Sequence, residues 1–536
     1  MKNMDSLRRR IPRLFAVTLL ALIVISTHGG NLKSAYAQSS LPYVEQSSAP
    51  KYAQAIENGR TLLQSLMESS KVAGLSVAVA VDGDVVWTEG FGYADLENRV
   101  PITPLSEFRV GSVAKSLTAT GLAVLYQQGK VDLDADFHKY VPYFPQKQYP
   151  VTVRQLGGHL GGIRTYNYAD YDVYKNEFVS TRRYDSVKDA LNIFKDSPLE
   201  HKPGTKYLYS TYGFVTLSAV IEGASGQDYL SYINNQVLQP LKLQSTVPDY
   251  NDAVVPYRTR FYMRREDGKL VNAPFTDNSN KWAAGGWLST PSDLVRWGST
   301  LIRTDFLKDD TKKIWWTSQK TTDGKETGYG IGFTIGKDYD GRRTVGHGGG
   351  SVGGTTTWVM FPDDGVVVAM AVNMSLSPMS SLAAETIAED FIKSRHDSGP
   401  STPAIDVSGS YEFSAQNSAG KQVSGTFLLT KSKTGGYTGH ILPEKEPQHS
   451  VRRSQDGSYG PPDIPEISIA HVSVNGNQVH IVGADSNAFV HAWFTLKGDA
   501  IDGRWIGRDV TGAMRGSRRA SVGSSASNRS DVEAVH

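Results

Sequence analysis

Cysteine is absent from all 536 residues of this chain. Its absence excludes disulfide bridges, thiolate catalysis, zinc sites with cysteine ligands and a lipid anchor on an N-terminal cysteine. The 12 histidines show no paired spacing of the His-Glu-x-x-His kind, which is typical of zinc-dependent hydrolases. We therefore expect no metal ion and no other cofactor.

Long hydrophobic runs are missing too. The apolar stretch from Leu14 to Ile25 has about half of the ~20 residues that a membrane-spanning helix needs. Arginines precede it, and the small-residue site Ala35-Tyr36-Ala37 follows. This order is typical of a secretory signal. We therefore expect residues 1–37 to be a signal peptide and the protein to be exported, to the periplasm or the extracellular space, without a stable membrane anchor after cleavage.

The sequence also lacks an excess of charge of either sign. The net charge is +2, and removal of residues 1–37 would take away six basic residues and one acidic residue, which leaves −3. Nucleic-acid-binding domains carry a basic patch that contacts phosphates, and no such block remains. The sequence therefore predicts no nucleic-acid partner.

The length exceeds that of one typical domain, and the composition changes along the chain. We expect a first domain at 51–396 and a second at 405–517, where short alternating runs separated by Gly, Asn and Asp turns predict seven or eight strands of a small all-β barrel. The remaining segments are assigned as a Ser/Gln/Pro-rich linker at 38–50, a linker at 397–404 and a disordered Ser/Arg-rich tail at 518–536.

The first domain shows an α+β pattern. Two apolar runs across an Asp-Gly turn predict a β-hairpin near its start, and a second group of strands returns near its end. We therefore predict one mainly antiparallel sheet flanked by helices, with a helical insertion. The expected helices are Lys51–Ser70, Asp185–Ile193, Gly213–Glu222 and Met379–Lys393, and the expected strands are Leu75–Val81, Val85–Trp87, Arg343–Val345, Thr355–Phe361 and Val366–Val372.

One stretch of the sequence contains candidate catalytic residues. Ser112 is followed at i+3 by Lys115, and an apolar helical run begins directly after them. On a helix these two side chains share a face, and a lysine buried in apolar surroundings loses its proton readily and can activate a serine hydroxyl. The same spacing occurs at Ser48…Lys51 and Ser418…Lys421, but neither pair opens an apolar helix, so we regard both as accidental.

Four motifs in a fixed order resemble one family. They are the Ser112–Lys115 helix, Tyr209-Ser210-Thr211 after a Pro-Gly turn, Gly285-Gly286-Trp287-Leu288-Ser289-Thr290, and His347-Gly348-Gly349-Gly350. Together they resemble the class C β-lactamase and D-alanyl-D-alanine carboxypeptidase family, in particular its esterase and peptidase branch. The resemblance covers about residues 50–395. His159 opens a stretch similar to another motif of that family, and some relatives carry a lipocalin-like domain that residues 405–517 resemble.

The resemblance implies roles for individual residues. Ser112 would be the acyl-forming nucleophile, Lys115 its proton acceptor and Tyr209 the second acid/base. The N–H groups of Ser112 and Gly350 would form the oxyanion hole, and Gly349 and Thr211 would also contact substrate. From the residues alone, a tyrosine such as Tyr209 among neighbouring tyrosines is more often a packing residue than a catalytic one. His159 is expected to be a hydrogen-bonded structural histidine rather than a ligand.

The sequence departs from the β-lactamase pattern twice. Thr211 stands where those enzymes carry Asn, and His347, which we count among the catalytic residues, stands where they carry a lysine that faces a substrate carboxylate. An ordinary histidine titrates near pH 6.5. We therefore expect the charge of His347 to control the binding of anionic substrates.

The resulting hypothesis is an exported serine hydrolase that cleaves an amide or ester bond in a small molecule or peptide, cell-wall fragments included, through an acyl-enzyme on Ser112. If the protein is an enzyme, the alternative function is that of a true β-lactamase or D-Ala-D-Ala carboxypeptidase. If it is not an enzyme, the alternative is a catalytically silent cell-wall scaffold. The sequence leaves the substrate and the oligomeric state open.

Overall fold

The computed structural model describes residues 43–167, 177–377, 381–396, 404–432, 436–444, 457–460, 466–485, 489–507 and 510–519. The predicted signal peptide lies outside the described residues, as do most of the predicted linker at 397–404 and the tail beyond Arg519. No helix in the described ranges has the length and apolar character that a membrane crossing requires.

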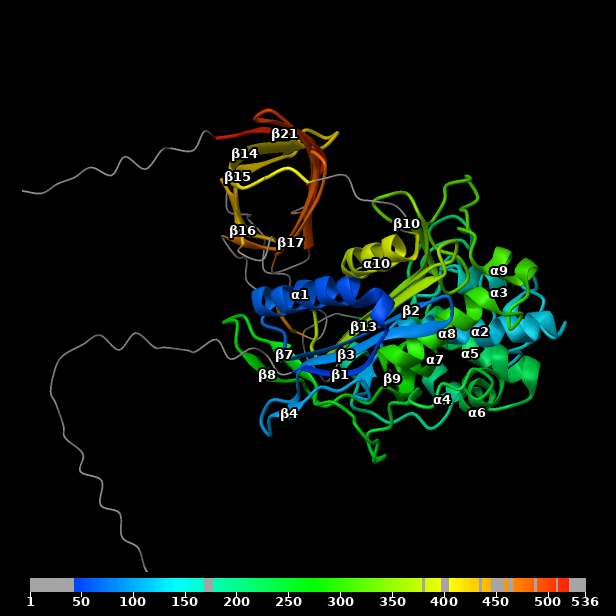
Figure 1. The fold of residues 1–536 in the computed structure, drawn as a ribbon. Helices are drawn as coiled ribbons and strands as arrows, with labels where there is room; N and C mark the ends of the chain where they lie inside the picture. Colours follow the sequence, from blue (N-terminus) through cyan, green and yellow to red (C-terminus); the bar gives the residue numbers. More distant parts are fainter. Residues whose placement is uncertain are drawn as a thin grey trace, which may run out of the picture. The chain divides into compact units, whose positions relative to one another are not determined.

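An antiparallel sheet forms the centre of the first domain (Figure 1). Its order is β1-β3-β2-β13-β12-β11-β10, and the short strand β4 pairs with β3. The bounds are β1 Tyr43–Ser48, β2 Gly74–Val81, β3 Asp84–Asp95, β4 Val100–Pro101, β10 Thr334–Lys337, β11 Arg343–Ser351, β12 Gly354–Phe361 and β13 Val366–Val372. The predicted architecture, an antiparallel sheet flanked by helices, is confirmed.

One linker assignment is wrong. Residues 43–48 lie within the predicted linker at 38–50, yet they form the edge strand β1, which pairs with β3 from Tyr43 opposite Phe91 to Ser48 opposite Trp87. Strand formation at an edge depends on the ladder that a neighbouring strand offers more than on local composition. The Ser/Gln/Pro content therefore concealed this strand.

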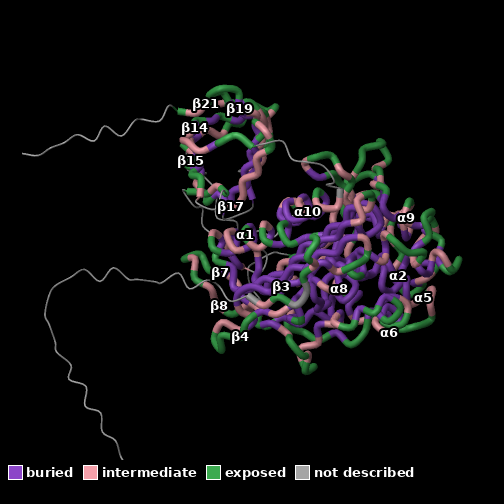
Figure 2. The backbone as a smooth tube through the Cα atoms, in the orientation of Figure 1, coloured by how far each residue is buried: buried purple, intermediate pink, exposed green. Residues whose placement is uncertain are grey.

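Helices cover both faces of the sheet because its strands alternate their side chains. In β2, Val77, Val79 and Val81 pack in one apolar cluster with α1 (Ala53–Ser70) and α10 (Ser381–His396). The intervening Ala78 and Ala80 pack in the larger cluster on the other face, with α2 (Val113–Gln127) and α8 (Pro291–Arg303). Figure 2 shows the resulting buried centre of the domain.

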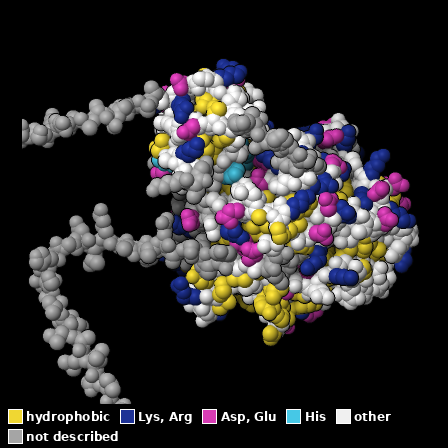
Figure 3. Space-filling model, viewed as in Figure 1, with side chains coloured by type: hydrophobic (Ala, Val, Ile, Leu, Met, Phe, Trp, Pro, Cys, Tyr) yellow, Lys and Arg dark blue, Asp and Glu magenta, His cyan; other side chains and the backbone are white. Residues whose placement is uncertain are grey.

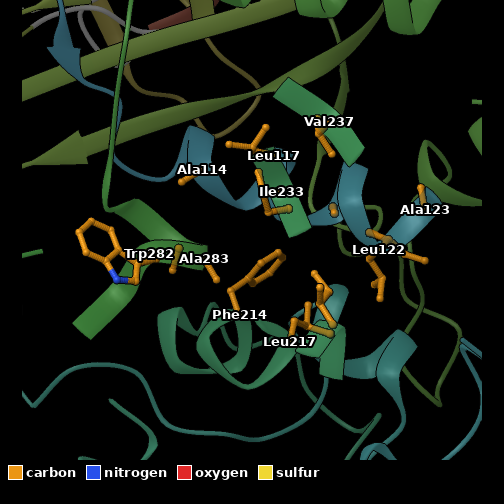
Figure 4. Close-up of a cluster of buried hydrophobic side chains, with 14 of the residues drawn as sticks. Ala114, Leu117, Leu122, Ala123, Phe214, Leu217, Ile233, Val237, Trp282 and Ala283 are labelled. Carbon is orange, nitrogen blue, oxygen red and sulfur yellow. The ribbon is translucent and has the colours of Figure 1, made fainter. Parts of the chain in front are cut away.

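The helical insertion packs against α2. Figure 4 shows Leu117 of α2, Phe214 of α5 and Ala283 of α7 as members of one buried cluster. The predicted helices Asp185–Ile193 and Gly213–Glu222 correspond to α4 and α5. The remaining bounds are α3 Val153–Gly157, α4 Val187–Leu191, α5 Thr211–Ser225, α6 Tyr229–Ile233, α7 Trp282–Gly285, α9 Asp309–Trp315, β5 Phe108–Arg109, β6 Val247–Pro248, β7 Tyr262–Arg264, β8 Leu270–Asn272, β9 Trp287–Ser289, and the short turns of helix η1 Pro50–Tyr52, η2 Phe137–Lys139, η3 Glu177–Val179, η4 Asn234–Leu238 and η5 Ser279–Lys281.

The second domain is a closed antiparallel barrel of eight strands, β14 to β21. Their bounds are β14 Gly409–Gln416, β15 Gln422–Lys431, β16 Tyr437–Pro443, β17 Ile467–Asn475, β18 Gln478–Ala484, β19 Phe489–Lys497, β20 Ala500–Gly507 and β21 Val510–Arg518. Buried side chains form its core, with Tyr411 stacked on Phe427 and Phe413 stacked on Trp505.

The strand that closes the barrel, β21, lacked a clear sequence signal and extends one residue into the predicted tail. A Cβ on Gly512 or Gly516 would lie within 2 Å of a carbonyl oxygen of β14. These glycines permit the close approach of the two strands, and they also interrupt the alternation of apolar residues that reveals a strand.

Charged side chains of both signs are interspersed on the face of the molecule seen in Figure 3. That distribution agrees with the near-zero net charge of the sequence.

Candidate active site

Ser112 is the residue directly before α2, in the turn from Val110 to Lys115. Its backbone dihedrals are already helical, with φ −64° and ψ −6°. Lys115 therefore lies one turn further along the same face, and its Nζ is 3.0 Å from the Ser112 Oγ. The geometry predicted from the i, i+3 spacing is thus present.

The amine of Lys115 is buried, and the groups that it contacts directly are uncharged. The side chain is fully buried, and Nζ donates to the Ala284 carbonyl at 3.0 Å and faces the Tyr209 ring at 4.7 Å from its centre. Within the described residues it forms no ion pair. Burial is the main reason that the pKa of Lys115 falls far below its usual value, and the positive charge of Lys281 lowers it further. The neutral amine is therefore favoured.

Tyr209 is positioned by His159. The ring of His159 packs on that of Tyr209 with centres 4.2 Å apart. His159 Nδ1 accepts a hydrogen bond from the Ser210 N–H at 3.0 Å, and its carbonyl accepts one from the Leu208 N–H at 2.9 Å. Burial lowers the pKa of His159 well below its usual value, so this histidine is a neutral support for the tyrosine loop.

His347 differs from the sequence-based expectation. Its side chain is only 6% exposed; its Nδ1 donates to the Gly348 carbonyl at 2.5 Å, and its Nε2 accepts from the Tyr329 hydroxyl at 2.8 Å. Burial is the main cause that lowers the pKa of His347 to about 3, and the charge of Lys115 adds to it. The expected change of charge near pH 6–7 is therefore wrong, because both ring nitrogens are bonded away from solvent.

Two glycines let β11 approach the serine turn. A Cβ on Gly349 would lie 1.9 Å from the Val110 carbonyl oxygen and 3.3 Å from the Ser112 nitrogen. A Cβ on Gly111, which has φ +51°, would lie 2.8 Å from the Gly350 nitrogen. The backbones that carry Ser112 and Gly350 are therefore neighbours, as an oxyanion hole made of their two N–H groups requires.

A cavity of about 310 Å³ opens beside the serine. It brings together Ser112, Tyr209, Thr211 and Gly350 of the sequence-predicted residues, whereas Lys115, His347 and Gly349 lie outside its lining. Its other wall residues are Thr165, Tyr166, Phe178, Lys281, Ala284, Gly285, Ser351, Thr355, Ser375, Leu376 and Ser377.

Sequence reasoning missed three contributors. Tyr329 holds His347, the Ala284 carbonyl holds Lys115, and Lys281 places a buried amine in the cavity lining. Only Lys281 had a local signal, since it ends a polar run just before Trp282-Ala283-Ala284. In the described parts of the chain, no group of three or more His, Asp or Glu side chains is placed to hold a metal ion.

A protein-family model and known proteins match part of this sequence. The family model described as Beta-lactamase matches residues 60–390. The human "Serine beta-lactamase-like protein LACTB, mitochondrial" is 32% identical over 464 residues, which cover 67% of this chain and 84% of that protein.

Two solved structures share the fold at 24% identity each. The octameric penicillin-binding protein homologue from Pyrococcus abyssi superposes with a TM-score of 0.55 and covers 86% of this chain and 99% of its own. A D-stereospecific amidohydrolase from Streptomyces sp. superposes with a TM-score of 0.51 and covers 64% of this chain and 99% of its own. With the family match over residues 60–390 and the identity to the human protein, the chain belongs to the β-lactamase family.

Proposed function

We propose that the protein is a serine hydrolase that cleaves an amide or ester bond through an acyl-enzyme on Ser112. One observation carries the proposal: a fully buried lysine amine lies 3.0 Å from a serine hydroxyl at the edge of a cavity. A serine needs an adjacent base to become a nucleophile, and burial supplies that base by favouring the neutral amine of Lys115.

The reaction would proceed in two halves. Ser112 Oγ attacks the substrate carbonyl carbon while its proton passes to Lys115 Nζ, and the oxyanion accepts hydrogen bonds from the N–H groups of Ser112 and Gly350. The tetrahedral intermediate then collapses, and the leaving group takes the proton from the lysine, through the Tyr209 hydroxyl. Water repeats the sequence on the acyl-enzyme and releases the acid.

His347 bears on the choice between branches of the family. A buried, neutral imidazole does not provide the fixed cation that a β-lactam or D-Ala-D-Ala carboxylate would meet on that wall. This supports an esterase or amidase over a β-lactamase or carboxypeptidase, and a structural similarity to an amidohydrolase makes amides worth testing. The intact Ser112, Lys115 and Tyr209 argue against a silent scaffold.

Covalent labelling tests the proposal without knowledge of the natural substrate. A fluorophosphonate should add one adduct mass to the wild-type protein and none to Ser112→Ala. Ser418→Ala, which alters the Ser-x-x-Lys pair of the barrel domain, is the matched control and should label like wild type. An unlabelled wild type would favour the scaffold, and rapid turnover of a chromogenic β-lactam would favour the β-lactamase alternative.

We also propose that residues 1–37 direct export and that the barrel is lipocalin-like. The charge and small-residue pattern at the N-terminus supports export, and eight antiparallel strands in a closed barrel support the second idea. N-terminal sequencing of the protein from its native cells should begin at Gln38. A cell-fractionation experiment that finds the uncleaved chain in the cytoplasm would contradict the export proposal.

A further inference from the structure

A lysine other than Lys115 lines the cavity, and it comes from η5. Lys281 ends η5 and is 3% exposed, and its Nζ donates to the Phe178 carbonyl at 2.7 Å. The rings of Phe178 and Tyr166 flank the amine, with centres 4.9 and 5.4 Å away. An ammonium has three N–H donors, so the bond to Phe178 leaves donors for a ligand in the cavity.

The segment that carries Lys281 is rigidly anchored by buried polar contacts. Asn278 Nδ2 donates to Asp249 at 2.8 Å, the Ser279 N–H donates to Asp277 at 2.9 Å, and Asn280 Nδ2 donates to the Glu177 carbonyl at 3.2 Å. A cation held this way needs little reordering when it meets a substrate, which favours binding.

The charged groups around Lys281 leave it without an ion-pair partner. Those that face it are Lys115, Arg109, Asp249 and Asp277. Asp249 pairs with Arg109 at 2.7 Å, and Asp277 accepts from Ser279 and Asn251. No carboxylate of the described chain lies at ion-pair distance from Lys281 Nζ. A buried amine in a substrate cavity without such a partner is costly unless a ligand supplies the opposite charge.

We propose that Lys281 recognises a carboxylate on the acyl arm of the substrate. This inference rests on the proposed acyl-enzyme chemistry at Ser112. Lys281 lines the cavity beside Tyr166 and Phe178. Thr165 and Thr211 line it as well, and the Thr211 N–H donates to Thr165 Oγ1 at 3.5 Å. The described lining thus holds one cationic side chain, Lys281, together with hydroxyl side chains that include those of Ser351, Thr355 and Ser375. The substrate class is an ester or amide of a dicarboxylic acid.

The charge state of Lys281 adds a pH signature to this geometry. Burial is the main cause that lowers its pKa to about 7; Arg109 lowers it further, and Asp249 and Asp277 oppose the shift. The amine is therefore charged below pH 7 and neutral above. The preference for the carboxylate-bearing substrate should fall as the pH rises through this value. The ionisation of Lys115 affects both substrates alike and cancels in their ratio.

The test compares p-nitrophenyl glutarate with p-nitrophenyl pentanoate, which differ in the terminal carboxylate. For the wild type, the ratio of their kcat/KM values should fall about tenfold between pH 6 and pH 8.5. Lys281→Met should lower the ratio at pH 6 about tenfold and make it flat with pH. Lys281→Arg keeps the charge at every pH and should restore part of the ratio without its pH dependence. Lys313→Met, which removes an exposed amine from α9, is the control.

Two further arms make the outcome decisive. The pentanoyl ester of 4-hydroxybenzoate carries its carboxylate on the leaving group, and a Lys281-dependent preference for it alone would overturn the assignment to the acyl arm. Binding of glutarate to the Ser112→Ala protein, measured by calorimetry at pH 6, should disappear in Ser112→Ala/Lys281→Met. This arm needs no turnover, so it separates a failure of the Lys281 inference from a failure of the hydrolase proposal. A wild-type ratio that does not change with pH or with Lys281→Met would refute the inference.

Discussion

Gly349 offers the sharpest test of how the fold positions Ser112. Its strand, β11, lies against the turn that begins α2, and a Cβ on Gly349 would be 1.9 Å from the Val110 carbonyl oxygen and 3.0 Å from its carbon. A Cβ does not approach an oxygen closer than about 3 Å, so Gly349→Ala must move the two backbones apart by about 1 Å. Both backbones carry the groups that the oxyanion hole needs.

The expected magnitude follows from that displacement. A misplacement of about 1 Å at a reacting group lowers rates by roughly 100-fold, and overpacking a close contact destabilises a fold by about 1–3 kcal/mol. Gly349→Ala should therefore slow fluorophosphonate labelling of Ser112 about 100-fold, measured as a second-order rate by intact mass, and lower the thermal midpoint by a few degrees.

A neighbouring glycine provides the matched control. Gly348 is exposed on the same strand, and a Cβ there would meet nothing within 4 Å. Gly348→Ala should leave both the labelling rate and the thermal midpoint close to wild type. If Gly349→Ala labels within threefold of wild type, the contact between β11 and the Val110–Ser112 turn does not position the nucleophile, and the reasoning fails.

The other predictions concern buried groups. Lys115→Met should abolish labelling and still raise the thermal midpoint at pH 7, because it removes a buried amine that has no ion-pair partner in the described structure. Lys281 binds a proton in the unfolded chain up to about pH 10.5 but loses it in the fold above about pH 7. Lys281 should therefore raise the free energy of unfolding by about 2 kcal/mol between pH 7 and 9. Denaturant midpoints measured across this range should increase less in Lys281→Met than in the wild type. Tyr329→Phe removes the hydroxyl that donates a hydrogen bond to His347 Nε2, and it should lower the thermal midpoint. An unchanged midpoint would mean that this hydrogen bond contributes nothing to stability. Trp505→Ala should lower the barrel's stability by about 3–5 kcal/mol, seen as a separate or earlier unfolding transition by calorimetry.

Local sequence determined the features that depend on neighbours along the chain. The i, i+3 spacing of Ser112 and Lys115 put both side chains on one helix face, and the Asp-Gly turn joined β2 to β3. The alternation of apolar residues predicted the antiparallel sheet and seven strands of the barrel. Periodicity and turn chemistry act over a few residues, so a single sequence reveals them.

Tertiary structure alone decided what depends on distant segments. β1 exists because β3 offers it an edge, and β21 closes the barrel because Gly512 and Gly516 allow β14 to come close. The sequence predicted that His347 is a pH-sensitive cation. In the structure its two ring nitrogens bond to Tyr329 and to the Gly348 carbonyl in a buried site. Lys281 became part of the cavity because Phe178, about a hundred residues away, holds its amine there. Burial and hydrogen-bond partners set the charge of an ionisable group, and both come from residues that the fold brings together from far apart in the chain.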